Sequence, residues 1–161
     1  TELGFIDTED DIKADLLYQL PFCVVIPELH PLAKKSAITW QDLLHSPLIT
    51  LQGPFLEQVT AELADEVASH VQQARYKVNF MSTALEMTRQ GFGITLCLPY
   101  MPEVIDWVSA NDLQMRPLTQ PRKMRQFFIY QRSSRALSPA TIAFKEFLQR
   151  YFSDHFDDLQ G

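Results

Sequence analysis

The sequence predicts an α/β fold, in which helices cover both faces of a parallel sheet. Short apolar runs rich in β-branched residues, as at 22–26 and 93–99, are typical of strands that are buried on both faces. These runs alternate with helical segments, which is the order of parallel strands joined by right-handed crossovers. A length of 161 residues suffices for one ordinary domain or for two small lobes that share a core.

Each strand is expected where an apolar or alternating run is bounded by turn residues. The run at 2–7 has no lead-in, so we expect a segment to precede it in the full-length protein, and an acidic loop follows at 8–15. Pro27 ends the strand at 22–26, because proline cannot donate a hydrogen bond to a sheet. Further strands are expected at 16–22, 47–51, 75–80, 93–99, 113–118 and 125–132.

Two helices are expected from capping signals. Thr39 and Asp42 have the spacing of a capping box at the start of a short helix. Thr83 and Glu86 have the same spacing before the segment that precedes the strand at 93–99, although Ser82 would also serve as the cap there.

Two more helices follow from the spacing of apolar residues. Between 55 and 70 apolar positions recur every three or four residues, which predicts one amphipathic helix. The last helix is expected to have Ser138 as its cap and Pro139 at its first position, followed after residue 152 by a polar, frayed tail. Its expected buried stripe is Phe144, Phe147, Leu148, Tyr151 and Phe152.

The composition is that of a globular protein with an acidic balance. Hydrophobic residues make up 46% and charged residues 21%, and the net charge of −6 makes the chain a poor candidate for binding phosphate backbones by itself. Cys23 and Cys97 lie in apolar runs and are expected to be buried thiols in a reducing compartment. With no signal peptide and no apolar run of ~20 residues, we expect a soluble, cytoplasmic protein without a membrane span.

Motifs for catalysis or metal binding do not stand out in the sequence. The histidines are scattered and form no HxH or HExxH pattern, and there is no CxxC: they are His30, His45, His70 and His155. Neither a GxSxG nucleophile elbow nor a GxxxxGK(S/T) phosphate loop occurs. We therefore expect no enzyme, no catalytic residue, no metal site and no cofactor.

A ligand is expected at the carboxyl ends of the strands, where helix N-termini present free N–H groups. The segments that reach this edge are 50–55, 79–83 and 98–101. Four side chains there are able to donate hydrogen bonds: Thr50, Gln52, Ser82 and Thr83. Gly53 permits a close approach of the backbone, and apolar walls are offered by Phe55, Met81 and Tyr100. Helix caps and core packing explain the serine, the second threonine and the methionine equally well.

The stretch LPFCVVIPELHPLAKKSAITWQDLLHSPLIT, residues 20–50, resembles the effector-binding domain of LysR-type transcriptional regulators. In that family a strand ends in a proline, here Pro27, shortly before an HPLA motif, here at 30–33, and a "DL" helix and a "PLI" strand follow. The segments RQGFGITLCLP at 89–99 and RALSPATIAFKEFL at 135–148 also match the family's pattern. The resemblance runs from about residue 3 to residue 152.

The resemblance implies a type 2 periplasmic-binding-protein-like α/β fold, with two Rossmann-like lobes joined by crossing strands. Residues 1–21 and 126–152 would form the first lobe, which is incomplete because the family's first elements of that lobe are not in this chain. Residues 22–125 would form the second lobe, and 153–161 a C-terminal tail.

The resemblance also implies a function, the sensing of a small-molecule effector in the cleft between the lobes to control transcription. DNA would be bound only through an N-terminal helix-turn-helix that is absent from this chain, and the full-length protein would be a homodimer or tetramer. One alternative is a solute-binding receptor of the same fold, which predicts a signal peptide. The other is a small enzyme on a related fold, which needs a titratable cluster in the cleft.

Positions at the cleft are carried over from the family. On the second lobe the expected ligand-binding residues are Thr50, Gln52, Gly53, Pro54, Phe55, Met81, Ser82 and Pro99. On the first lobe they are Phe5 and Asp7, and only Asp7 is titratable. Its carboxylate would repel an anionic effector and favour an amino or polyhydroxyl group. The Thr50 hydroxyl is expected to face the effector.

Overall fold

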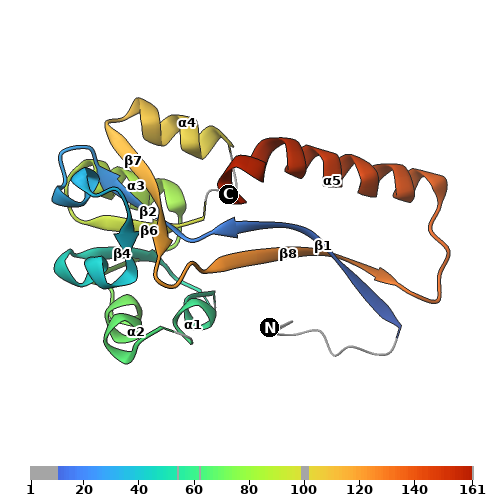
Figure 1. Cartoon of the computed structure of the whole chain (residues 1–161), viewed down its shortest axis with the longest axis horizontal. Helices are drawn as coiled ribbons and strands as arrows, with labels where there is room; N and C mark the ends of the chain where they lie inside the picture. Colours follow the sequence, from blue (N-terminus) through green and yellow to red (C-terminus); the bar gives the residue numbers. More distant parts are fainter. Residues whose placement is uncertain (1–10, 54, 62, 99–101, 161) are drawn as a thin grey trace. The chain divides into compact units, whose positions relative to one another are not determined.

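The chain divides into two compact units in the computed structural model, which describes residues 11–53, 55–61, 63–98 and 102–160 (Figure 1). The terminal unit comprises residues 1–19 and 126–161, and the central unit residues 20–125. The strand expected at 2–7 lies outside the described residues.

The central unit is built on a mixed six-stranded sheet. Its strands are β2 (Cys23–Pro27), β3 (Ile38–Thr39), β4 (Leu48–Leu51), β5 (Tyr76–Val78), β6 (Ile94–Cys97) and β7 (Leu113–Thr119), in the spatial order β3-β7-β2-β6-β4-β5. β4 is parallel to β5 and β6, and β3 is parallel to β7, whereas β2 is antiparallel to both β6 and β7. The prediction of a purely parallel sheet is wrong at β2. An unbroken apolar run indicates that both faces are covered, but it carries no information on the direction of the neighbouring strands.

Helices cover both faces of this sheet, as predicted (Figure 1). One face carries the 3₁₀ helix η2 (Trp40–His45), α1 (Phe55–Thr60) and α2 (Asp65–Gln72), and the other carries α3 (Met81–Arg89) and α4 (Pro102–Ala110). Because side chains alternate along β2, Val24 and Ile26 join the first cluster of buried residues, and Cys23 and Val25 join the second. The central strand thus supplies both cores.

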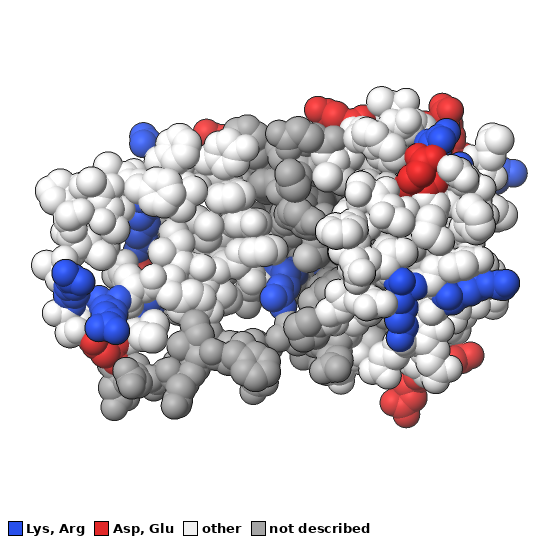
Figure 2. Space-filling model, turned by 180° about the vertical axis from the view of Figure 1, so that it is seen from behind, with Lys and Arg blue, Asp and Glu red and all other residues white. Residues whose placement is uncertain are grey.

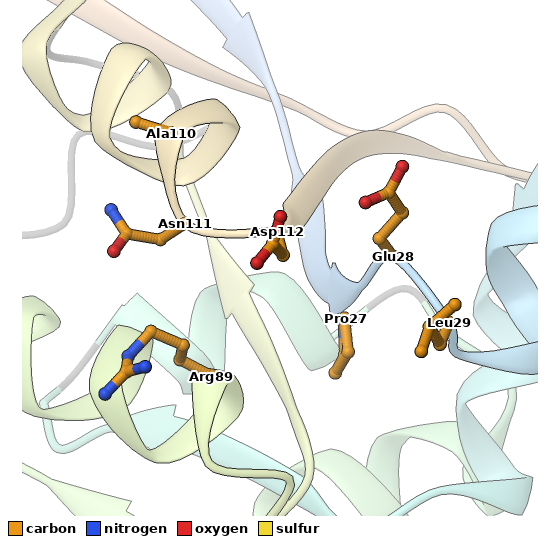
Figure 3. Close-up of a pocket in the computed structure, with 7 residues that line it drawn as sticks. All are labelled: Pro27, Glu28, Leu29, Arg89, Ala110, Asn111 and Asp112. Carbon is orange, nitrogen blue, oxygen red and sulfur yellow. The ribbon is translucent and has the colours of Figure 1, made fainter.

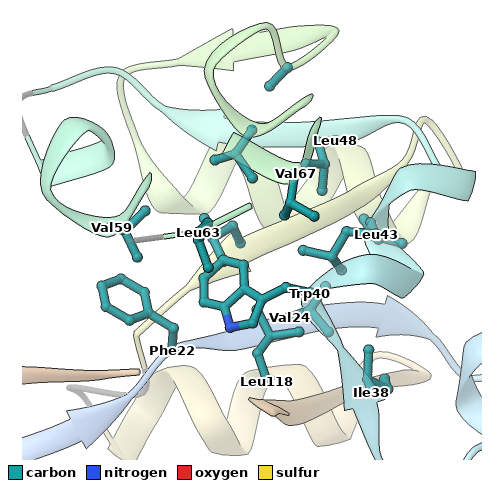
Figure 4. Packing of buried hydrophobic residues seen from close by; sticks show 14 of the residues in the cluster. Phe22, Val24, Ile38, Trp40, Leu43, Leu48, Val59, Leu63, Val67 and Leu118 are labelled. Atoms are coloured by element: carbon teal, nitrogen blue, oxygen red, sulfur yellow. The ribbon is translucent and has the colours of Figure 1, made fainter. Parts of the chain in front are cut away.

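Trp40 lies in the middle of the first cluster (Figure 4). Its side chain is 1% exposed, and its ring centroid is 6.1 Å from that of Phe22. The indole Nε1 donates a hydrogen bond to the Pro121 carbonyl oxygen at 2.9 Å, so that its polar atom is satisfied although the ring is buried. Leu63 and Val67 pack on the helical side of the same cluster.

The HPLA segment is a scaffold element. It forms a short 3₁₀ helix, η1 (Pro31–Lys34), which begins at His30. The Nδ1 atom of His30 accepts a hydrogen bond from the Leu32 N–H at 3.2 Å, and its Nε2 atom lies 3.3 Å from the Ser46 hydroxyl, two residues before β4. The predicted capping box that follows is confirmed, because Thr39 and Asp42 each accept a hydrogen bond from the other's backbone N–H.

The helix predicted at 55–70 is interrupted. α1 ends at Thr60 and α2 begins at Asp65, and the turn between them is closed by a hydrogen bond from the Leu63 N–H to the Thr60 carbonyl oxygen at 3.1 Å. Leu63 is buried in this turn, in the same cluster as the apolar residues of both helices. The apolar spacing therefore predicted the buried side correctly and the continuity of the helix wrongly.

α3 begins without the predicted cap. Phe80 is the residue before its first turn, and no side chain caps the helix, so Ser82 and Thr83 lie inside the helix. The Glu86 carboxylate, expected to complete a capping box, instead accepts hydrogen bonds from Arg89 at 2.6 and 2.9 Å. The predicted helix end is confirmed, because Gly91 follows the helix with a φ of 81°.

α4 was not predicted from the sequence. It begins at Pro102, and Val104 and Val108 pack against the second cluster four residues apart. Proline at a first helical position followed by apolar residues at this spacing is the signal that would have indicated it.

The terminal unit consists of a two-stranded ribbon and one helix. The ribbon pairs β1 (Ile12–Pro21) with β8 (Met124–Arg132), and α5 spans Pro139–Gln160. The predicted cap of α5 is confirmed by a hydrogen bond from the Thr141 N–H to the Ser138 hydroxyl at 3.2 Å. Two expectations are wrong: the strand begins at Ile12, within the expected acidic loop at 8–15, and the helix continues to Gln160 where a frayed tail at 153–161 was expected. Asp15 is held within the strand by an ion pair with Lys145 at 2.6 Å.

The predicted buried stripe of α5 is largely exposed. Phe144 and Phe147 are 61% and 54% exposed, whereas Lys145 and Phe152 lie against the ribbon, where the Phe152 ring stacks on Tyr18 at 4.0 Å. A helix face is buried only where another element covers it, and in the described residues the ribbon contacts the predicted stripe at Phe152 and leaves Phe144 and Phe147 uncovered. Within 11–19 and 126–154, where side chains are described, no residue of this unit is buried.

We predict that Gly93→Ala destabilises the central unit by about 1–3 kcal/mol, the usual effect of overpacking. A Cβ at Gly93 would overlap the Pro47 carbonyl oxygen, to which the Ile94 N–H donates at 2.9 Å, so β6 would have to move away from the start of β4. Urea unfolding followed by Trp40 fluorescence measures the change.

The matched control is Gly91→Asn, because a Cβ at Gly91 meets no atom within 4 Å and asparagine tolerates its positive φ. Equal midpoints for the two variants would contradict the close contact at Gly93.

Candidate functional site

The carboxyl ends of β4 and β5 meet at one edge of the central sheet, because the two strands are parallel. The Gln52 N–H donates a hydrogen bond to the carbonyl oxygen of Val78, the last residue of β5, at 2.8 Å. α3 then begins at Met81. The loop after β4 and the start of α3 are therefore neighbours, as the sequence predicts, and we call this edge, formed by residues 50–53 and 78–83, the β4–α3 edge.

Thr50 has a buried hydroxyl group for which the described residues offer no partner. Its side chain is 0% exposed, and its Oγ1 atom has no hydrogen-bond partner among the described residues. Nearly all buried polar side-chain atoms in proteins are hydrogen-bonded, and one that is not lowers stability by about 1–3 kcal/mol. This atom is the strongest indication of a ligand contact at the edge.

The two parts of the edge belong to opposite faces of the sheet. In the register of β4 and β6, Leu48 lies opposite Ile94 and Ile49 opposite Thr95. Thr50 alternates with Ile49 and therefore points, like Leu48, to the face covered by α1 and α2. α3 covers the other face. Its first turn and the Thr50 hydroxyl therefore lie on opposite faces of the sheet at this edge.

The start of α3 offers N–H groups that no side chain caps. Ser82 and Thr83 are exposed, whereas Met81 is half-buried and packs against the second cluster, so that the methionine is partly core. Gly53 is exposed, has a φ of 148° and has no atom near its Cβ position, an arrangement that leaves its backbone open to a close neighbour. Uncapped N–H groups of this kind favour a hydrogen-bond acceptor or an anion.

Some of the predicted ligand-binding residues lie outside the part of the chain that the structure describes. Phe5, Asp7, Pro54 and Pro99 are not among the described residues, and of Phe55 the structure describes only that it begins α1. Their roles stay predictions from the family resemblance.

Sequence reasoning missed a buried pair of threonines beneath α3. The Thr88 and Thr95 hydroxyl oxygens are 2.6 Å apart, and both lie within hydrogen-bond distance of the Ala84 carbonyl oxygen, at 3.0 and 3.2 Å. The pair ties α3 to β6 and leaves no hydroxyl without a partner. The one sequence signal for it is that Thr88 follows Ala84 by four residues, a spacing at which a threonine hydroxyl in a helix can donate to the earlier carbonyl oxygen.

A surface hollow of about 440 Å³ lies at the other end of the central sheet (Figure 3). It is lined by the end of β2 at Pro27, by Arg89 at the C-terminal end of α3, and by the turn at Asn111 and Asp112 before β7. Arg89 is already paired with Glu86, and its guanidinium lowers the pKa of that carboxyl to about 2. None of the residues that line the hollow belongs to the β4–α3 edge.

Lysine and arginine side chains form no large patch on the face of the molecule shown in Figure 2. On the face shown in Figure 2 the lysine and arginine side chains stand in small separate groups. This distribution and the net charge of −6 do not suit the binding of a nucleic acid backbone by that face. Among the helices of the described residues, none is long and apolar enough to cross a lipid bilayer.

The sequence profile of the family described as LysR substrate binding domain matches residues 3–153. Among curated proteins, the chain is similar to YbhD of Escherichia coli (strain K12), an uncharacterized HTH-type transcriptional regulator, with 28% identity over 158 residues. That alignment covers 94% of this chain and 47% of the relative, so the chain spans about half the length of the curated protein it matches.

Solved structures share the fold. The effector binding domain of QuiR in complex with shikimate has a TM-score of 0.62 and 21% identity, over 94% of this chain and 70% of that one. The Synechocystis PCC6803 CcmR regulatory domain in complex with 2-PG has a TM-score of 0.68 and 16% identity, over 95% and 73%. The C-terminal domain of a probable LysR family regulator from Rhodococcus sp. RHA1 has a TM-score of 0.65 and 21% identity, over 89% and 70%.

We predict that Thr50→Val raises the free energy of unfolding by about 1 kcal/mol, because valine has the same shape and removes a buried hydroxyl that has no partner in the described part of the chain. Urea unfolding of the ligand-free protein measures the change.

Thr88→Val and Thr95→Val are the matched controls. Each removes a paired hydroxyl from the same sheet neighbourhood and should lower the free energy of unfolding by about 1 kcal/mol or more. Destabilisation of Thr50→Val to the same extent would show that its hydroxyl has a partner in the folded protein.

Proposed function

Since the chain belongs to the family of LysR substrate-binding domains, we propose that it is the effector-sensing part of a longer transcriptional regulator. The match over residues 3–153 carries this proposal. The family comprises ligand-binding domains of regulators and not enzymes, and it favours a regulator over a solute-binding receptor. YbhD is named as an HTH-type regulator, and DNA binding of that kind would belong to a segment outside this chain.

The proposed ligand is a small polar molecule bound at the β4–α3 edge. The Thr50 hydroxyl, buried without a described partner, would bond to it, and the uncapped N–H groups at the start of α3 would receive its acceptor atoms. Gln52 and Ser82 would add exposed hydrogen-bonding groups, and Met81 an apolar wall. The ligands named for the QuiR and CcmR structures, shikimate and 2-PG, are of this small size.

We further propose that the two units correspond to two lobes, with residues 22–125 as the second lobe and 1–21 with 126–152 as part of the first. The division into compact units supports this assignment. The terminal unit has no buried residue in its described part and exposes large apolar side chains, as expected of a lobe that lacks some of its elements. The solved effector-binding domains named above are also longer than the part this chain covers.

The remaining proposals concern the whole regulator. It would act in the cytoplasm, where its DNA lies, as a homodimer or tetramer. Effector binding would change the relative position of the lobes and through it the geometry of the DNA-binding parts.

The function is tested with the complete regulator that contains this chain. A small metabolite that raises its melting temperature should also change its binding to promoter DNA in a gel-shift assay, because a ligand stabilises the state it binds. Thr50→Val should weaken the binding of that ligand by about 0.5–1.5 kcal/mol, the contribution of one neutral hydrogen bond. Calorimetry measures the affinity, with Ser109→Ala on the exposed side of α4 as the control. A ligand that the protein converts into a product would contradict the proposal.

If the first lobe is incomplete in this chain, one substitution should change the stability of this chain and of the complete regulator to different extents. In this chain Phe147→Ser should reduce binding of the dye ANS and leave stability nearly unchanged, because Phe147 is 54% exposed. In the complete regulator the same change should destabilise by about 3–5 kcal/mol, because the side chain would be buried there. Equal small effects in both proteins would show that this face of α5 stays uncovered.

A further inference from the structure

Cys23 and Cys97 stand directly opposite one another on neighbouring strands. β2 and β6 are antiparallel, and their register pairs Cys23 with Cys97. Opposed residues in such a pair have Cα atoms about 4.5–5.5 Å apart, and their side chains point to the same face. Both thiols are free, as predicted, and 2% and 1% exposed, and they are the chain's only cysteines. The sheet thus brings the two thiols of the protein to one point.

The surroundings of this pair are apolar and contain further sulfur. Both cysteines belong to the second cluster, beside Val25 and Leu85, and Met81 of α3 and Met115 of β7 pack against that cluster while partly exposed. In the ranges that the structure describes, no three residues of the His, Cys, Asp and Glu types come together as metal ligands. Zinc, which takes four nitrogen, oxygen or thiolate ligands, has no set of donors here.

We propose that Cys23 and Cys97 form a two-coordinate binding site for a divalent thiophilic metal ion of the mercury(II) type. Two thiols and one ion give a neutral bis-thiolate complex and release two protons, one from each sulfur. Soft thiolate sulfur is the donor that such ions prefer. The site is independent of the proposed function.

The charge balance selects a divalent ion. Burial raises the pKa of the Cys23 thiol to about 12, although the charge of Arg122 acts in the opposite direction, and burial raises the pKa of Cys97 well above its ordinary value, so both sulfurs are protonated in the free protein. An isolated thiolate is unfavourable in this apolar cluster, and a monovalent ion bound by two thiolates would leave one negative charge there. A divalent ion leaves none, because metal coordination deprotonates both thiols and cancels both charges.

The same burial protects the pair from peroxides, which react with thiolates. The pair lies at one end of the central sheet. Cys23 is the first residue of β2 and Cys97 the last residue of β6, so both lie at the ends of their strands. Met81, which is half-buried, packs against their cluster. Since β6 is parallel to β4, Cys97 lies at the same end of the sheet as the β4–α3 edge.

The test is a titration of the reduced protein with mercury(II) chloride in weakly buffered, thiol-free solution. Ultraviolet charge-transfer absorption reports metal–thiolate bonds, and a pH-stat counts released protons. The expected result is one ion per chain, two protons per ion, a monomer by light scattering and a raised melting temperature, because the ion binds the folded state. Zinc(II) should not bind under these conditions.

Cys23→Ala and Cys97→Ala are the variants, and circular dichroism checks that each is folded. Each should lower mercury affinity more than about 100-fold, since even the loss of groups that only support metal ligands weakens binding by 10–100-fold. If either variant is unfolded, the wild-type proton count and melting temperature decide alone. Two ions per chain with one proton each, an ion-bridged dimer, or a lowered melting temperature would each overturn the proposal.

Discussion

The central unit depends on strand β2, which is shared by two cores. Its residues from Cys23 to Ile26 alternate between the cluster around Trp40 and the cluster beneath α3 and α4, and Val24, Val25 and Ile26 are all fully buried. The strand is also hydrogen-bonded on both sides, to β6 and to β7. A side chain that does not fit at either face shifts the backbone that the other face packs against, so the two clusters are not independent.

The direction of β2 follows from how the chain enters the sheet. β1 leads into β2 with only Phe22 between them, and β7 leads into β8 after a short turn, so β2 and β7 run in opposite directions at the middle of the sheet. A parallel arrangement of two strands requires a long crossover, and β4, β5 and β6 are joined by two of them, one through α1 and α2 and one through α3. The crossing strands therefore set the mixed topology, which the apolar runs alone could not predict.

Local signals predicted local structure, and they failed where the outcome depends on distant residues. The Thr39 capping box involves residues three apart, and it forms as expected. At the start of α3 the same spacing failed, because Glu86 found a stronger partner in Arg89 one turn further on. At the candidate site the sequence indicated Thr50 by its position after an apolar run, but its missing partner is visible only once the fold surrounds it.

The apolar face of α5 shows the limit of periodicity in another way. The spacing of Phe144, Phe147 and Tyr151 predicts a buried face, and these side chains are exposed in the terminal unit. A spacing pattern indicates which side of a helix needs a cover and does not indicate where along a protein the cover is encoded. The part of α5 that packs on the ribbon includes Phe152, a member of the predicted stripe, whose ring stacks on Tyr18. It also carries an ion pair between Lys145 and Asp15, a contact that a count of apolar residues overlooks.

Thr50, Thr88 and Thr95 are all buried at the central sheet, but the described fold explains only two of the three hydroxyl groups. Thr88 and Thr95 share their hydrogen bonds with each other and with a carbonyl oxygen, so the fold alone accounts for them. Thr50 is equally buried, and no group of the described fold accounts for its hydroxyl. Sequences agree with their folds at most positions and depart from that agreement mainly at functional sites. That departure at Thr50, at the edge where parallel strands end, is the physical reason for proposing a ligand there.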